Sequence, residues 1–308
     1  QNYENSTTMG RPGMNKKIVN SYLMADGSRF TDKAGYETMT FDQECQNRDP
    51  RLAQTIRTPG YTRIGSTKKE APNLAYTMTG YHLIKYSMTA NYDEYNKSCN
   101  DIPLFRTAEV YLNFAEAKAE LGTLKQADIN KSIKLLRDRV GMTNLDMELA
   151  NSKPDPYLMS AATGYPNVKG ANQGVILEIR RERTIELAME GFRYYDIMRW
   201  KEGKLFENDL LGIYVPGPGT YDLDKDGTDD VCFYVGTKPA GNVPLYLEIG
   251  EQIRLSNGES GYIICHSLIT KKWNEDRDYL YPVPISERTL SNGVITQNPG
   301  WNDGLNFN

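Results

Sequence analysis

The densest group of carboxylate side chains lies in one short segment and comprises Asp222, Asp224, Asp226, Asp229 and Asp230. Carboxylates at alternate positions, followed by Gly227, match the first half of a calcium-binding loop. Phe233 occupies the position at which an EF-hand loop has a bidentate glutamate, so the EF-hand form is excluded. Two interpretations stay open: a shorter turn that binds a structural calcium ion, and a solvated acidic hairpin turn, for which Asp-Gly is typical.

Candidates for acid–base catalysis are few. His82 and His266 are the two histidines, and neither stands at ligand or triad spacing from the other. Glu182 and Glu186 are four residues apart, so a pair of carboxylates on one helix face could act on a glycosidic bond. The sequence contains neither a phosphate loop nor a dinucleotide-binding motif, and we expect no organic cofactor.

Arginines surround both glutamates in the sequence and are Arg180, Arg181, Arg183 and Arg193. Ion pairing lowers the pKa of a carboxyl group, which is the wrong direction for a general acid. We therefore interpret the segment as a structural charge network, joined by Asp196 and Arg199, rather than as an active site. Arg48 and Arg51 flank Asp49-Pro50, and we expect their forked donors to hold loops in place.

Tyrosine is unusually abundant, with 21 Tyr against 8 Phe and 3 Trp. Sugar rings have apolar faces, which aromatic rings cover, and hydroxyl rims, which Asn, Asp and Arg bind. In a loop-rich segment, polar residues alternate with Tyr61, Tyr76, Tyr81, Tyr86, Tyr92 and Tyr95. The predicted ligand contacts are Tyr61, Asn73, Tyr76 and Tyr81, with the distant Trp273 as a further candidate. The alternative for each ring is a structural role.

The elements that must position these side chains are clearest between residues 101 and 203. Small and apolar residues recur at helical spacing over residues 108–119 and again over 129–140. Gly122 and Gly141 end the two segments, so the pattern predicts an antiparallel helical hairpin of tetratricopeptide type. Further helices are predicted at 175–190, which carries the Glu–Arg group, and at 192–200.

The flanking segments, residues 1–100 and 204–308, are rich in Gly, Pro, Asn and Thr. We expect mainly loops there, with short strands at 231–235 and 262–265. The predicted fold class is mainly α, a tetratricopeptide-like helical frame with large loop insertions and a few short strands. We treat residues 1–308 as one domain with a loop-rich beginning, a helical core and a tail of loops and strands.

Bulk composition excludes several classes of function. With 308 residues and 39% hydrophobic side chains, the chain is long enough for a sizeable core. A net charge of -4 without a basic field disfavours nucleic acid as a partner. No run approaches the roughly 18 apolar residues typical of a membrane span. The widely spaced cysteines, Cys45, Cys99, Cys232 and Cys265, match no zinc-site spacing and do not fix the compartment.

Four segments together resemble the SusD/RagB family of outer-membrane nutrient-binding lipoproteins. They are residues 47–52 (NRDPRL), 106–117 (RTAEVYLNFAEA), 179–200 (IRRERTIELAMEGFRYYDIMRW), and the ending formed by 281–286 (YPVPIS) and 296–301 (TQNPGW). They occur in the family's order, from about residue 40 to the end of the chain. The third segment and the Gln-Asn-Pro-Gly ending are the specific ones. The chain resembles the C-terminal portion, and we expect a helical N-terminal half and a lipid-bearing cysteine outside it.

The resemblance implies a SusD-like helical fold and a non-catalytic protein that binds oligosaccharide at the cell surface. It implies attachment to the outer membrane through a lipid anchor outside this chain. It also implies a partner, a SusC-like TonB-dependent transporter that receives the glycan. Two alternatives stay open: a helical-repeat scaffold that binds peptide or protein, and a carbohydrate-active enzyme.

Overall fold

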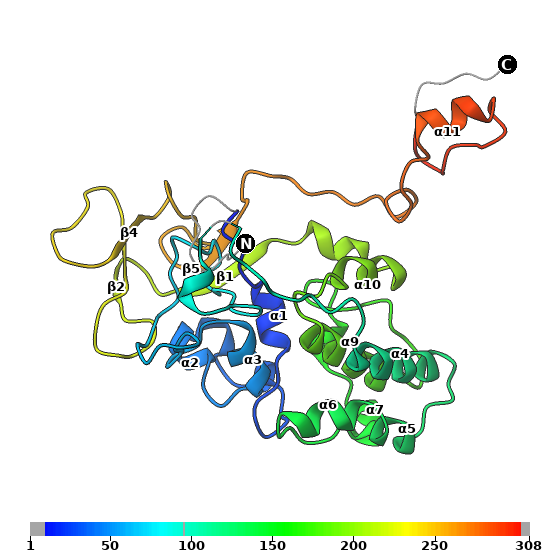
Figure 1. The fold of residues 1–308 in the computed structure, drawn as a ribbon, viewed down its shortest axis with the longest axis horizontal. Coiled ribbons are helices and arrows are strands. Elements are labelled where there is room, and N and C mark those ends of the chain that lie inside the picture. Colours follow the sequence, from blue (N-terminus) through cyan, green and yellow to red (C-terminus); the bar gives the residue numbers. More distant parts are fainter. Residues whose placement is uncertain (1–9, 95, 303–308) are drawn as a thin grey trace.

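The computed structural model describes residues 10–94 and 96–302, which are mostly helical with a few short strands (Figure 1). The α-helices are α1 (Lys16–Ser21), α2 (Phe41–Glu44), α3 (Pro50–Thr55), α4 (Thr107–Glu120), α5 (Gln126–Asn130), α6 (Ile133–Arg139), α7 (Met147–Ser152), α8 (Pro156–Met159), α9 (Gln173–Glu186), α10 (Arg193–Arg199) and α11 (Ile285–Leu290). The 3-10 helices are η1 (Phe30–Asp32), η2 (Tyr36–Thr38), η3 (Ala90–Tyr92) and η4 (Gly203–Glu207). The strands are β1 (Leu210–Val215), β2 (Gly219–Tyr221), β3 (Val231–Tyr234), β4 (Leu245–Glu248) and β5 (Gly261–Cys265).

Helix α9 is the centre of the helical part. Every residue from Gly174 to Glu186 is buried, the charged residues included. Helices α4, α6 and α7 gather around it (Figure 1), and α1 contacts it as well. Gly174 permits the approach of α7, because a Cβ atom there would lie 1.8 Å from the carbonyl oxygen of Ala150. The predicted third helix is confirmed up to Glu186, and all its faces are covered, but its predicted last turn to residue 190 is not helical.

The first predicted helix is confirmed as α4, which buries the face formed by Ala108, Leu112, Ala115 and Ala119. The second predicted helix is wrong as one element, because it is divided into α5 and α6. Ser132 stands at the break, fully buried and with a non-helical φ of -133°. Its hydroxyl donates to the carbonyl oxygen of Asp128 at 2.7 Å, and such local bonds compete with the helical backbone.

Two apolar cores lie on either side of α9. One joins α4, α6 and α9 through residues such as Leu112, Ile133 and Ile179. The other joins α1 and α3 to the strands through residues such as Val19 and Phe233. Its strands form an antiparallel β1–β5 pair and a β2-β3-β4 sheet in which β3 and β4 are parallel. The strands predicted at 231–235 and 262–265 are confirmed as β3 and β5.

Arg48 anchors the segment before α3, as its sequence context predicts, and does so by joining the C-terminal ends of α1 and α2. Its guanidinium donates to the carbonyl oxygens of Val19, Tyr22 and Glu44 at 2.6, 2.9 and 2.6 Å. The same group lies 3.8 Å from the ring centre of Phe30. The last carbonyl groups of a helix have no partner within it, so they need such donors when they are buried.

A charge network ties α9 to its neighbours. Glu182 accepts from Arg51 of α3 at 2.5 Å and from Arg137 of α6 at 2.8 Å. Burial alone would raise the pKa of Glu182, but the two guanidinium groups outweigh it and lower that pKa to about 2. One turn later, Glu186 accepts from Arg51, Arg106 and Arg139 at 3.1, 2.8 and 2.8 Å. The predicted structural role of this glutamate pair is thereby confirmed, but its partners are not the predicted ones: Arg180, Arg181, Arg183 and Arg193 bind other groups.

The network extends to α10, as predicted. Asp196 accepts from Arg183 of α9 at 2.7 Å and from Arg199 at 2.9 Å. Arg199 also pairs with Glu116 of α4, which accepts from the indole nitrogen of Trp200 at 2.7 Å. Trp200 is buried in the core between these helices, as its sequence position indicates.

The C-terminal segment with α11 extends away from the rest of the molecule (Figure 1). It exposes apolar side chains such as Leu290, and the outer face of α4 likewise exposes Val110 and Phe114. Within residues 10–94 and 96–302, none of the helices combines the length and the apolar character that a bilayer crossing requires.

We expect Glu182→Gln to lower the free energy of unfolding by about 3–5 kcal/mol, because it leaves two buried guanidinium groups short of a carboxylate. Urea denaturation of the full-length protein measures this change. Asp138→Asn is the control, because its pair with Lys134 is exposed at 48% and 42% of the two side chains and contributes about 0–1 kcal/mol. Equal effects of the two substitutions would contradict a structural role for the network.

Candidate functional site

Of the ligand residues predicted in the loop after α3, some are accessible at the surface and one is buried. Residues 57–82 form what we call the tyrosine loop. Tyr61 and Tyr76 are partly exposed, whereas Tyr81 is 0% exposed. The Tyr81 hydroxyl donates to Glu44 at 2.7 Å, and Glu44 also pairs with the buried Lys16. The prediction of ligand contact is wrong for Tyr81, because a ring without an exposed face cannot stack on a sugar.

Arg57 and His82 connect the remaining members of the tyrosine loop. The Arg57 guanidinium lies 5.3 Å from the ring centre of Tyr61, and the Arg57 amide donates to the His82 carbonyl oxygen at 2.8 Å. The His82 ring lies 6.2 Å from that of Tyr76 and accepts from the backbone amide of Asn73 at 3.2 Å. Two partly exposed rings and one amide side chain are thus held on one short segment. His82 is buried, and its place here is structural.

Trp273 belongs to a separate group of rings beside η4. Its ring centre lies 5.3 Å from that of Phe206 and 5.1 Å from that of Tyr279. Gly203 makes this packing possible, because a Cβ atom there would lie 2.0 Å from the indole ring. Trp273 is partly exposed, so contact of this second ring group with a ligand stays a prediction.

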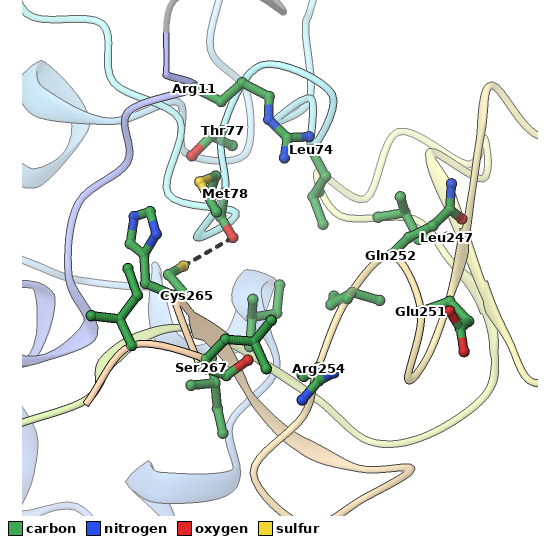
Figure 2. A pocket seen from close by; sticks show the side chains of 16 residues that line it. Arg11, Leu74, Thr77, Met78, Leu247, Glu251, Gln252, Arg254, Cys265 and Ser267 are labelled. Carbon is green, nitrogen blue, oxygen red and sulfur yellow. Dashed lines mark hydrogen bonds between the residues drawn. The ribbon is translucent and has the colours of Figure 1, made fainter.

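A cavity of about 450 Å³ lies behind the tyrosine loop (Figure 2). Leu74, Thr77 and Met78 form one wall, so the segment that carries Asn73 and Tyr76 also lines the cavity. The opposite wall consists of residues 251–254 and 263–269. The Met78 carbonyl oxygen accepts from the thiol of Cys265 at 3.3 Å, which joins the two walls (Figure 2).

The polar rim of this cavity was missed by sequence reasoning. It includes Arg11, Gln252 and Arg254, which stand in no recognisable motif. Arg11 and Arg254 are far apart in the sequence, so only the folded chain brings them to one space. The nearest signal is the density of turn-forming residues around 250–260, which indicates loops but not their contents.

The acidic turn gathers three of its five predicted carboxylates. Asp222, Asp224 and Asp226 place oxygen atoms within 4.8 Å of one another. Asp230 lies close by and accepts from the Leu223 amide at 2.7 Å. Burial, together with the neighbouring charge of Asp224, raises the pKa of Asp230 to about 6 although the Leu223 amide opposes this. A divalent cation would relieve this repulsion, and the donor set is the all-oxygen type that calcium prefers.

Asp229 is exposed and is not a member of the group of three carboxylates. Calcium binding at this turn stays a prediction, and the geometry favours Asp222, Asp224 and Asp226 as its ligands.

The fold defines a class of protein: a mainly helical frame with long ordered loops that carry rings and charges. Comparison with protein-family models matches residues 1–301 to the SusD family, and the chain belongs to that family. Membership in this family agrees with the expectation of a binding protein rather than an enzyme. A search of curated proteins found no match.

Solved structures of SusD-like proteins share the fold. A SusD-like protein of Bacteroides fragilis is 21% identical, with a TM-score of 0.55 over 94% of this chain and 47% of its own. A second protein from the same organism, described as a SusD-like carbohydrate-binding protein, is 22% identical, with a TM-score of 0.55 over 90% of this chain and 47% of its own. The chain thus spans about half the length of these relatives.

We expect calcium to raise the melting temperature of the full-length protein after chelator treatment. The stabilisation is about 2.7 kcal/mol when calcium is at 100 times its dissociation constant. Asp224→Asn should abolish the increase, and Asp229→Asn should leave it unchanged. Titration calorimetry with no heat, together with an unchanged melting temperature, would instead identify a solvated turn.

Proposed function

We propose that the protein binds oligosaccharide without reacting with it, through rings of the tyrosine loop. The observation that carries the proposal is membership in the SusD family. The partly exposed rings of Tyr61 and Tyr76 add a chemical means of binding. One structure of the same fold is described as that of a carbohydrate-binding protein. We further propose that the protein acts at the outer-membrane surface, attached by a lipid anchor outside this chain. It would pass the glycan to a TonB-dependent transporter.

The chemistry of the tyrosine loop suits a sugar better than a flat apolar ligand. Each ring of Tyr61 and Tyr76 offers one apolar face to the C–H face of a pyranose. Asn73 lies between them in sequence, and its side-chain carbonyl oxygen accepts from the Ala75 backbone amide at 2.8 Å. The remaining amide donors can bind hydroxyl groups at the rim of a sugar.

Two observations weigh against the other candidate functions. The glutamate pair on α9 does not suit a glycosidase, which needs a carboxylic acid with a raised pKa, because Glu182 is fully buried and its pKa is lowered to about 2. A repeat scaffold needs several stacked hairpins, whereas α4 packs chiefly on the central α9.

We expect Tyr61→Ala and Tyr76→Ala each to weaken glycan binding about tenfold, equivalent to about 1.4 kcal/mol of lost stacking. Affinity electrophoresis of the full-length protein against plant, host and microbial polysaccharides identifies a retarding glycan, and calorimetry then measures its dissociation constant. Tyr246→Ala is the matched control, because Tyr246 is partly exposed on β4, outside the loop.

Unchanged affinity in both loop variants would remove the tyrosine loop from the binding site. Retardation by no polysaccharide in the panel would contradict the proposed function itself.

A further inference from the structure

The cavity behind the tyrosine loop has the volume of a small-ligand site, but its lining lacks the large aromatic side chains on which sugars stack. Its volume of about 450 Å³ falls in the range of sites that hold small ligands, about 300–1,000 Å³. Its apolar part is aliphatic, with Leu74, Leu247, Ile253 and Ile263 among the residues. The lining contains no Tyr, Trp or Phe. The one aromatic ring of the lining is the imidazole of His266, so polar or ionic contacts must supply most of the affinity of a ligand in this space.

The charged groups of the lining are two guanidinium groups and one carboxylate, those of Arg11, Arg254 and Glu251. Within residues 10–94 and 96–302, neither guanidinium takes part in a salt bridge or a side-chain hydrogen bond. The Arg11 side chain reaches over the open space from its upper side, and Arg254 comes from the opposite wall (Figure 2). Arg11 is partly exposed and Arg254 is exposed at the mouth of the cavity, whereas Arg51 and Arg106, which line another space, are paired.

The backbone fixes both sides of the cavity in definite positions. The Arg11 carbonyl oxygen accepts from the Met78 amide at 3.0 Å, and the Arg254 carbonyl oxygen accepts from the Ile264 amide at 2.9 Å. Arg11 and His266, both in the lining, adopt positive φ angles of 44° and 55°. Non-glycine residues adopt such angles at a cost, and they concentrate at binding sites where the surroundings enforce them.

The electrostatic environment at the base of the cavity is positive. Cys265 lies there as a thiol, because burial raises its pKa to about 11. The cationic groups of Arg11 and Lys271 are both close enough to oppose that shift. The thiol is therefore uncharged at neutral pH and adds no negative charge, and no covalent step is implied.

We propose that this cavity binds the acidic group of an anionic sugar residue, a uronate carboxylate or a sulfate ester. Forked guanidinium donors suit both groups, and their interaction is strongest where solvent is partly excluded. The apolar wall covers the C–H face of the same residue, and the amide nitrogen of Gln252 is available for a hydroxyl, because its oxygen already accepts from the Glu248 amide. The inference rests on the proposed function and narrows its ligand to acidic glycans.

The test compares acidic and neutral polysaccharides on the full-length protein. Polygalacturonate, alginate and hyaluronan supply carboxylates, dextran sulfate supplies sulfate esters, and dextran, galactan and carboxyl-reduced polygalacturonate are the neutral counterparts. We expect at least tenfold tighter binding of one acidic group of polymers, weakening with added salt. Arg11→Gln and Arg254→Gln should each remove most of this preference, and Arg11→Lys should restore part of it.

Lys33→Gln is the control for net charge, because Lys33 is exposed on another part of the chain. Melting temperatures of all variants confirm that they fold.

An unchanged preference in both arginine variants overturns the proposal. Binding of neutral polymers as tight as that of acidic ones also overturns the proposal, but it leaves the proposed function standing. Binding of no polymer of either kind contradicts the proposed function and this inference together. The difference between the uronate and sulfate arms identifies which acid is bound.

Discussion

The structure depends on the complete pairing of the charges on α9. A helix that is buried on every face and carries both glutamates and arginines is stable only if each charge finds a partner. Those partners come from α3, α6, α10 and the segment before α4, so the same pairs that neutralise α9 also position its neighbours. Among these partners, Arg51 connects the charge network to the tyrosine loop. It lies on α3, the helix from which the tyrosine loop begins, and it contacts both Glu182 and Glu186.

The binding surface follows from this frame. The segment from Asn73 to Met78 carries a partly exposed ring and an amide, and its Leu74, Thr77 and Met78 line the cavity. An oligosaccharide that stacks on Tyr76 would contact the same segment that lines the arginine-containing cavity. Rings would hold the apolar faces of the sugars, and the guanidinium groups would select acidic residues among them. None of these contacts requires a bond to form or break.

Much of the helical frame could be predicted from sequence, because it depends on local patterns. The apolar face of α4, the structural role of Glu182 and the anchoring role of Arg48 follow from spacing and residue type. The partners of Glu182 do not, because Arg51 and Arg137 come from distant helices rather than from the arginines beside it in the sequence. The break at Ser132 could not be predicted, because one buried hydroxyl bond decides it. Tyr81 was misassigned because a buried Glu44–Lys16 pair takes its hydroxyl. The arginines of the cavity were missed because distant loops bring them together.

The most direct test of the account is a crystal structure of the full-length protein soaked with an oligosaccharide that it retains. The account predicts intact glycosidic bonds, a sugar face against Tyr61 or Tyr76, and an acidic substituent within hydrogen-bonding distance of Arg11 or Arg254. A cleaved oligosaccharide, or an intact one bound away from both the tyrosine loop and the cavity behind it, would contradict it.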